Sequence, residues 1–282
     1  MTWTEAERQL LVAGWNRAQR RRHDPEPLEA IQARANRLFT DDVVDLAQAV
    51  PGLLEQGLLV QDEDRIGLGD PASDIVPGLL HEHLRQSFEM GLVRLFQSQA
   101  NAELSRRVYG TDLQHLNMVD HAQMEHLLDE LALKPGEQVV DLGCATGAIA
   151  ERLSDDHGVQ VTGLDFARPA IAEARRRTAH KADRLSFVVG DLNALDLPAH
   201  SFDVALSVDT LYFVTELESV VGTILGLVRP GGRLAIFWSQ NRTEDQPESE
   251  LEPGHTAVAR ALDHHGARWH HTEFTEQGEG LW

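Results

Sequence analysis

An apolar segment that ends near an aspartate and passes directly into a glycine-rich turn constrains this chain more than any other feature. Asp141 and Leu142 close the apolar run 138–142, the turn occupies 143–147, and a helical pattern follows. The alternation then repeats, with strands predicted at 159–164, 185–189, 202–208 and 233–238 and helices at 148–155, 169–180 and 216–228. Such a rhythm predicts an α/β fold with a doubly wound, mostly parallel sheet that binds ligands at the carboxyl ends of its strands.

Three carboxylates follow three successive predicted strands. Asp141 lies at the end of the first strand, Asp165 directly follows the second, and Asp191 follows the third. A single aspartate at a strand end is most often a turn former, but three in corresponding places favour a shared ligand site. Gly143 and Gly147 would let a ligand approach the backbone closely, because neither has a side chain.

Five motifs, taken in order, resemble the class I S-adenosylmethionine-dependent methyltransferases, and most closely their small-molecule branch. The resemblance covers residues 120–240 and rests on the segments 139–147, 163–165, 190–192, 201–205 and 227–234. It implies a Rossmann-like sheet with S-adenosylmethionine as cofactor and S-adenosylhomocysteine as product. The implied reaction moves a methyl group to a small-molecule acceptor by in-line displacement, in which catalysis is chiefly alignment.

The resemblance also implies roles around the cofactor. Asp165 would accept hydrogen bonds from the ribose hydroxyls, Phe166 would lie against the adenine, and Asp191 would meet the adenine amino group. The family usually has glycine where this chain has Ala145. Cys144 is interpreted as a small buried spacer and not as a nucleophile. The expected cofactor-binding residues are Tyr109, Asp141, Gly143, Cys144, Ala145, Gly147, Asp165, Phe166, Asp191, Leu192 and Ser207.

The catalytic residue is unknown, because the sequence contains no recognisable catalytic dyad. Asp209 and Tyr212 follow the strand predicted at 202–208, in a segment that faces the reacting methyl group in class I enzymes. His115 precedes the sheet, and its ordinary pKa near neutrality would suit a general base. A histidine on the solvent face of a helix is the alternative interpretation.

Two alternatives from other functional classes stay open. An NAD-dependent dehydrogenase would share the fold, but its G-x-G-x-x-G fingerprint is not met, because Ala145 and Ala148 stand at the second and third glycine positions. A cofactor-sensing regulator would bind DNA through the N-terminal part of the chain.

That N-terminal part predicts helices at 5–22, at 28–38, from Thr40 and at 51–57, followed by a β-hairpin of 58–60 and 65–68. Residues 25–70 resemble a winged helix-turn-helix domain. We therefore expect two domains, a helical, winged-helix-like module with connecting helices at 1–120 and the S-adenosylmethionine-binding domain at 121–282.

The charge disfavours a nucleic-acid partner. The chain has 25 Lys and Arg against 45 Asp and Glu, a net charge of −20. The helices predicted from Thr40 and at 51–57 carry Asp41, Asp42, Asp45 and Glu55 and no Lys or Arg, so they are poor partners for phosphate. We expect the module to cover a substrate or to form a homodimer.

Other features bear on compartment and on the end of the sheet. A single cysteine, no signal sequence and no apolar run of about 20 residues predict a cytoplasmic protein without a membrane partner. The paired histidines at 264–265 and 270–271 lack chelating spacing, so no metal site is predicted. Class I sheets normally have seven strands, and because only one strand is predicted after Trp238, at 267–274, a C-terminal strand is expected to be missing.

Overall fold

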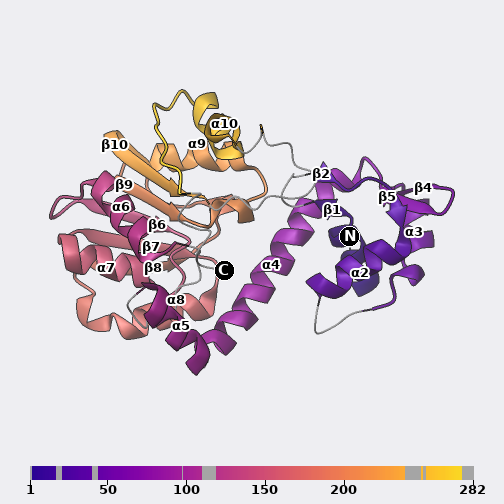
Figure 1. Cartoon of the computed structure of the whole chain (residues 1–282), viewed down its shortest axis with the longest axis horizontal. Coiled ribbons are helices and arrows are strands. Elements are labelled where there is room, and N and C mark those ends of the chain that lie inside the picture. Colours follow the sequence, from indigo (N-terminus) through magenta and orange to yellow (C-terminus); the bar gives the residue numbers. More distant parts are fainter. Residues whose placement is uncertain are drawn as a thin grey trace. The chain divides into compact units, whose positions relative to one another are not determined.

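The computed structural model separates into two compact units, Met1–Leu84 and Arg85–Trp282, and each is considered by itself (Figure 1). The domain boundary expected at residue 120 stays a prediction. The structure describes residues 2–16, 21–39, 44–96, 98–109, 119–238, 249 and 252–274.

The second unit contains a five-stranded sheet in which every neighbouring pair is parallel. The strand order is β10 (Val228–Phe237), β9 (Phe202–Val208), β6 (Gln138–Leu142), β7 (Gln160–Asp165) and β8 (Leu185–Val189). The chain winds outward from β6 in both directions, so the crevice between β6 and β9 is the switch point of a doubly wound sheet. The predicted α/β fold is confirmed.

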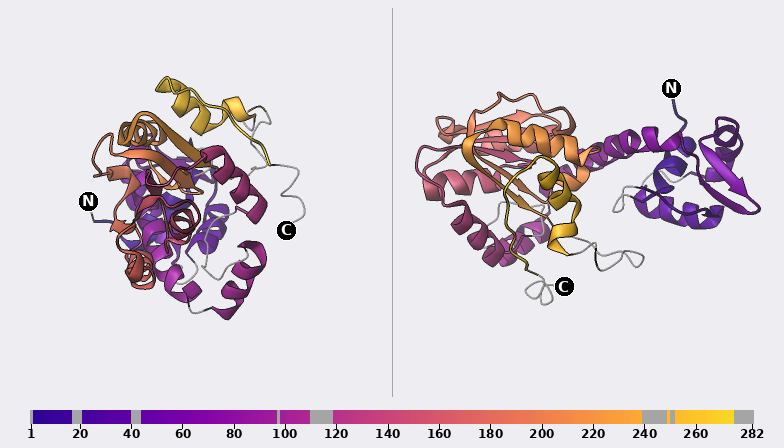
Figure 2. Two further views of the ribbon diagram at one scale, coloured as in Figure 1. Left: turned by 90° about the vertical axis from the view of Figure 1, so that its left-hand side faces the viewer. Right: turned by 90° about the horizontal axis from the view of Figure 1, so that it is seen from above.

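Helices cover both faces of this sheet (Figure 2). On one face α6 (His121–Leu131), α7 (Ala148–His157) and α8 (Arg168–Arg177) bury a core around Leu128, Leu153 and Phe187. On the other face α9 (Leu217–Leu227) and α10 (Ala257–His264) pack against Val140 and Leu164. Because both faces of β6 are buried, its sequence is apolar on successive residues, as is typical of parallel strands.

The first unit has α1 (Glu5–Ala13), α2 (Leu28–Leu38), the 3₁₀ helix η1 (Leu46–Gln48) and α3 (Val50–Glu55) around its own core. A three-stranded antiparallel sheet completes it, in the order β3 (Glu26–Pro27), β5 (Arg65–Leu68) and β4 (Leu59–Asp62). The hairpin and the helix at 28–38 are confirmed, whereas the identification as a winged helix stays a prediction. Two further helices, α4 (Ala72–Phe96) and α5 (Gln99–Tyr109), follow along the chain.

Three expectations about element bounds are wrong. The helix expected at 5–22 ends at Ala13, because Gly14 follows and the chain turns into β1 (Trp15–Asn16), which pairs with β2 (Arg21–Arg22). The strand expected from Arg233 begins at Val228, and a register shift between Val228 and Arg233 accommodates the Pro-Gly-Gly segment. The helix expected from Thr40 is the short η1 over its described part, and residues 40–43 lie outside the described residues.

A fourth wrong expectation concerns the strand predicted at 267–274, which is described but forms no strand. Side chains, and not a backbone ladder, hold this segment in place. The His270 Nε2 atom lies 3.1 Å from Glu130 Oε2 on α6, and the Phe274 ring centroid lies 6.4 Å from that of Phe237. Over the described residues the sheet therefore has five strands, with β10 at one edge.

No helix in the described ranges is both long and apolar enough to cross a bilayer.

Candidate active site

The turn after β6 is built around two glycines whose missing side chains are required. Gly143 and Gly147 have φ values of 82° and 75°, in the left-handed region that glycine alone adopts readily. A Cβ atom on Gly143 would lie 2.1 Å from the Thr210 Cγ2 atom, and one on Gly147 would lie 2.4 Å from the Phe187 Cε1 atom. Any larger residue at either position would displace the packed neighbours of the turn.

Hydrogen bonds close this turn. The Gly147 N–H donates to the Cys144 carbonyl at 2.7 Å, while the N–H groups of Gly143 and Cys144 both donate to the Leu164 carbonyl. Ala145, at the first corner of the turn, has φ 47°. This conformation costs an alanine about 1–2 kcal/mol relative to the right-handed region. The turn is therefore held against a local preference of its own sequence.

Asp165 reaches from the end of β7 to the same turn. Its Oδ2 atom accepts a hydrogen bond from the Ala145 N–H at 2.9 Å, and its Oδ1 atom accepts one from the Ala167 N–H at 2.8 Å. The residue is only 8% exposed. Each carboxylate oxygen retains capacity for a further donor, such as a ribose hydroxyl.

Asp141 is still more deeply buried, at 1% exposure, and its Oδ2 atom has no hydrogen-bond partner among the described residues. Burial, together with the nearby charge of Asp165, raises the pKa of Asp141 from its ordinary value of 3.8 to about 7. Burial also raises the pKa of Asp165, against the lowering effect of its two backbone donors. An unpaired buried acceptor beside a second carboxylate is suited to a ligand that brings hydrogen-bond donors.

Asp191 follows β8 after Gly190 and caps the 3₁₀ helix η3 (Leu192–Ala194). Its Oδ1 atom accepts hydrogen bonds from the Asn193 backbone N–H at 2.8 Å and from Asn193 Nδ2 at 3.0 Å. Leu192 is buried. The turn-former interpretation therefore describes part of what Asp191 does, and its role toward adenine stays a proposal.

The end of β9 contacts the glycine turn through a residue that sequence reasoning missed. The Thr210 hydroxyl donates to the Leu142 carbonyl at 3.0 Å and lies 2.6 Å from the Ser207 Oγ atom. Asp209, the preceding residue, is 4% exposed and has φ 54°. No motif marks Thr210 in the sequence, because its partner Leu142, next to the glycine turn, lies far away along the chain.

An aromatic cluster lies next to Asp165. The Phe88 ring, from α4, meets Phe166 and Phe213 edge to face, with centroid distances of 6.0 and 5.0 Å. Sequence reasoning identified Phe166 but not Phe88, since its helical spacing gave no sign of a long-range contact. These rings provide an apolar surface beside the carboxylates.

Some expected site residues are not placed. His115 and the side chains of Tyr109 and Tyr212 lie outside the described residues. Cys144 is buried, and burial raises the pKa of its thiol well above the ordinary value, which suits a spacer and not a nucleophile. Within the described ranges, no group of three His, Cys, Asp or Glu side chains is arranged to hold a metal ion.

Parts of this chain are similar to known proteins. Residues 140–236 match a family model described as a methyltransferase domain. A 27-O-demethylrifamycin SV methyltransferase from Amycolatopsis mediterranei is 33% identical over 149 residues, which are 49% of this chain and 54% of that protein. A demethylmenaquinone methyltransferase from Beutenbergia cavernae is 38% identical over 109 residues, which are 39% of this chain and 43% of that protein.

Among solved structures, a S-adenosylmethionine-dependent methyltransferase from Geobacter sulfurreducens in complex with S-adenosyl-L-homocysteine matches with 26% identity and a TM-score of 0.40. The match covers 51% of this chain and 54% of that one. The chain spans about half the length of the curated relatives it matches. The sheet order, the glycine turn after β6 and the family match agree: residues 140–236 match a methyltransferase domain, and this part of the chain resembles the class I S-adenosylmethionine-dependent methyltransferases.

Proposed function

We propose that the protein transfers the methyl group of S-adenosylmethionine to a small-molecule acceptor. The observation that carries this proposal is the buried pair Asp141 and Asp165 beside the glycine turn, at the carboxyl ends of β6 and β7. The unpaired Asp141 Oδ2 atom and the remaining acceptor capacity of Asp165 fit a ligand rich in hydroxyl and amino groups.

Each residue has a defined part in this proposal. Asp165 would bind the ribose hydroxyls, Phe166 would lie against the adenine, and Asp191 would accept from the adenine amino group. When bound, the cofactor supplies a methyl group already activated on a sulfonium. The chain then has to align the acceptor and exclude water, and the apolar rings of Phe88 and Phe213 suit that task.

The base, where the acceptor needs one, is proposed to be Asp209, with Tyr212 and His115 as the other candidates. Asp209 combines burial with a left-handed backbone at the end of β9, and strained backbone of this kind gathers at functional sites.

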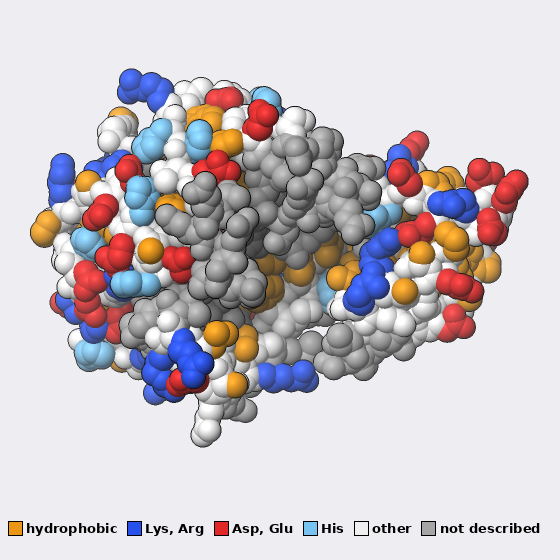
Figure 3. All heavy atoms as spheres, viewed as in Figure 1, with side chains coloured by type: hydrophobic (Ala, Val, Ile, Leu, Met, Phe, Trp, Pro, Cys, Tyr) orange, Lys and Arg blue, Asp and Glu red, His pale blue; other side chains and the backbone are white. Residues whose placement is uncertain are grey.

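A small-molecule acceptor is favoured over a nucleic acid. The matched relatives named above are a rifamycin and a menaquinone methyltransferase. The described helices η1 and α3 of the first unit carry no Lys or Arg, and acidic side chains gather at the end of that unit where the β4–β5 hairpin lies (Figure 3). Phosphate binding requires the opposite charge.

Calorimetric titration tests the proposed function. We expect S-adenosylmethionine and S-adenosylhomocysteine to give saturable one-to-one binding, whereas NAD gives none. The product is the better probe, because it cannot react. Absence of heat with both sulfur ligands would overturn the proposal, and saturable binding of NAD would support the dehydrogenase alternative.

We also propose that a second copy of the chain docks on the first unit. Leu38 and Val60, which are 41% and 49% exposed, are its two large exposed hydrophobic side chains among the described residues. Burial of such side chains between two copies would stabilise the dimer by about 25 cal/mol for each Å² of apolar surface removed from water. The cytoplasmic location stays a prediction.

The test is light scattering after gel filtration. The wild-type protein is expected to be a dimer, and Leu38→Glu with Val60→Glu is expected to give a monomer. Leu104→Glu, at a 58% exposed position of the second unit, is the matched control and should leave the dimer intact. A monomeric wild type would refute dimerisation. In a separate binding assay, salt-dependent retention of duplex DNA by the protein would favour the regulator alternative.

A further inference from the structure

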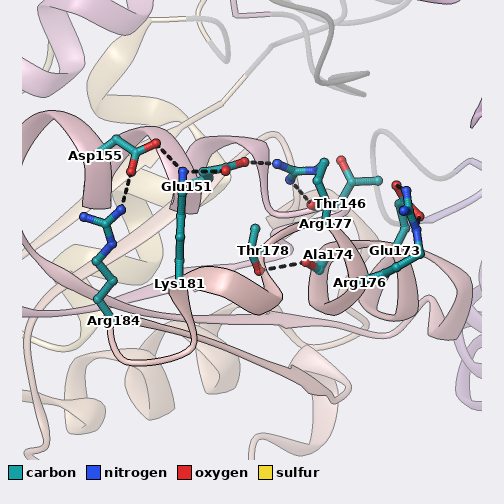
Figure 4. Close-up of polar contacts among 10 residues, drawn as sticks. All are labelled: Thr146, Glu151, Asp155, Glu173, Ala174, Arg176, Arg177, Thr178, Lys181 and Arg184. Carbon is teal, nitrogen blue, oxygen red and sulfur yellow. Dashed lines mark hydrogen bonds and ion pairs between the residues drawn. The ribbon is translucent and has the colours of Figure 1, made fainter.

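An ion-pair network joins α7 to the end of α8 and to the segment that follows it (Figure 4). Glu151 and Asp155 come from α7, and both accept from the Lys181 ammonium, at 2.7 and 2.6 Å. Arg184 pairs with Asp155 at 2.8 Å, and Arg177 pairs with Glu151. The network thus contains three cations, of which Arg184 is at its outer end and Arg177 at its inner end.

Arg177 differs from the other cations because it also contacts the glycine turn. Its Nη2 atom donates to the Thr146 carbonyl at 2.7 Å, while Glu151 pairs with the Nη1 side of the same guanidinium. The Arg177 side chain is 23% exposed and that of Glu151 12% exposed, so both are shielded from solvent. One planar group therefore links the Thr146–Gly147 peptide to the first turns of α7.

This contact falls beside the strained residue of the turn. Ala145 has φ 47°, and its N–H is held by Asp165 Oδ2. The carbonyl of the next residue, Thr146, is held by Arg177. The two contacts thus secure the peptide group before Ala145 and the Thr146–Gly147 peptide group, which begins one residue after it.

We propose that Arg177 is a positioning residue for the glycine turn. It holds this turn in the left-handed conformation that Ala145 disfavours. The proposal rests on the proposed function in that it takes this turn to contact the cofactor. It predicts that the importance of Arg177 depends on which residue occupies position 145. With glycine there, the turn would need no external support.

Titration of S-adenosylhomocysteine into four variants tests this dependence. Arg177→Met is expected to raise Kd about fivefold or more, as for loss of one hydrogen bond to a charged group. Arg184→Met removes a cation from the same network without touching the turn, and should leave Kd within about twofold. Ala145→Gly combined with Arg177→Met should bring Kd back to within about twofold of Ala145→Gly alone.

Two results would overturn the proposal. One is an equal change in Kd for Arg177→Met and Arg184→Met, since the network would then act only on overall stability. The other is an undiminished effect of Arg177→Met in the Ala145→Gly background. Should Arg177→Met not fold, Arg177→Lys is used in its place, because lysine keeps the positive charge but lacks the paired N–H donors of the guanidinium. The Kd of Arg177→Lys is expected to be about threefold higher than that of Arg184→Lys. Wild-type affinity of Arg177→Lys would then refute the proposal.

A ligand-free measurement separates this proposal from the proposed function. The amides of Ala145 and Gly147 are hydrogen bonded in the turn, to Asp165 Oδ2 and to the Cys144 carbonyl. Their hydrogen exchange is expected to be faster in Arg177→Met than in Arg184→Met. Equal exchange would refute the positioning role, whereas a wild-type protein that binds no S-adenosylhomocysteine would refute the proposed function alone.

Discussion

Replacement of Asp165 by alanine is expected to weaken the binding of S-adenosylhomocysteine more than tenfold. The carboxylate is 8% exposed and already orders two backbone N–H groups, those of Ala145 and Ala167. A charged hydrogen bond in such a setting contributes about 1.5–3 kcal/mol, and its loss also leaves the two donors unpaired. Both effects act where the ribose hydroxyls are proposed to bind, so the affinity for S-adenosylhomocysteine should fall more than tenfold.

Asp203 provides the matched control for this measurement. Its carboxylate also accepts from a backbone N–H, that of Gln138 at 2.8 Å, and pairs with Arg229, but at the amino ends of β6 and β9. Asp203→Ala should lower the melting temperature without changing affinity. An Asp165→Ala protein that binds as tightly as the wild type would show that Asp165 is only a turn residue.

Substitution of Asp141 by asparagine is expected to flatten the pH dependence of stability. The folded-state pKa of Asp141 is raised to about 7 from an ordinary 3.8, so the folded protein holds this proton more tightly than the unfolded chain. The contribution is fully present below pH 3.8 and is lost as the pH rises through about 7. A shift of this size corresponds to a few kcal/mol, as an order of magnitude.

Urea unfolding of both proteins at pH 5.5 and pH 8 measures this effect. Asp141→Asn should lose less stability between the two pH values than the wild type, because an amide does not ionise. Asp203 and Glu125 have lowered pKa values, so they affect stability only at more acidic pH than the two values compared. The histidines are the same in both proteins and therefore do not change the difference between them. Identical slopes in the two proteins would contradict a raised pKa of Asp141 in the folded protein.

Local sequence signals predicted the framework of the site well. The bounds of β6, β8 and β9 coincide with the predicted strands, because a short apolar segment followed by glycine or aspartate leaves a strong local pattern. The parallel order follows from the alternation with helices. The start of β10 was missed, since Pro230 and the glycines after it are turn signals, and only pairing with β9 reveals Val228 as part of the strand.

The contacts that shape the turn could not be predicted in this way. Arg177 lies 31 positions from Thr146 and reads as one of three consecutive arginines on a helix surface. Thr210 lies 68 positions from Leu142. Neither pair has a periodic or compositional signature. The positive φ of Ala145 likewise contradicts local propensity, which is why it becomes visible only in the folded chain.

The register shift in β10 has a consequence for self-association. Over the described residues this strand pairs with β9 alone, so the N–H and C=O groups of its other edge could pair with a strand of another molecule. Pro230 lacks an N–H, and pairing is interrupted between Val228 and Arg233. Only the five residues from Arg233 to Phe237 form a continuous ladder, and Arg233 brings a guanidinium paired with Glu137. The regular part of this edge is therefore short and begins with an arginine, and both features disfavour the pairing of β10 with a strand of another molecule.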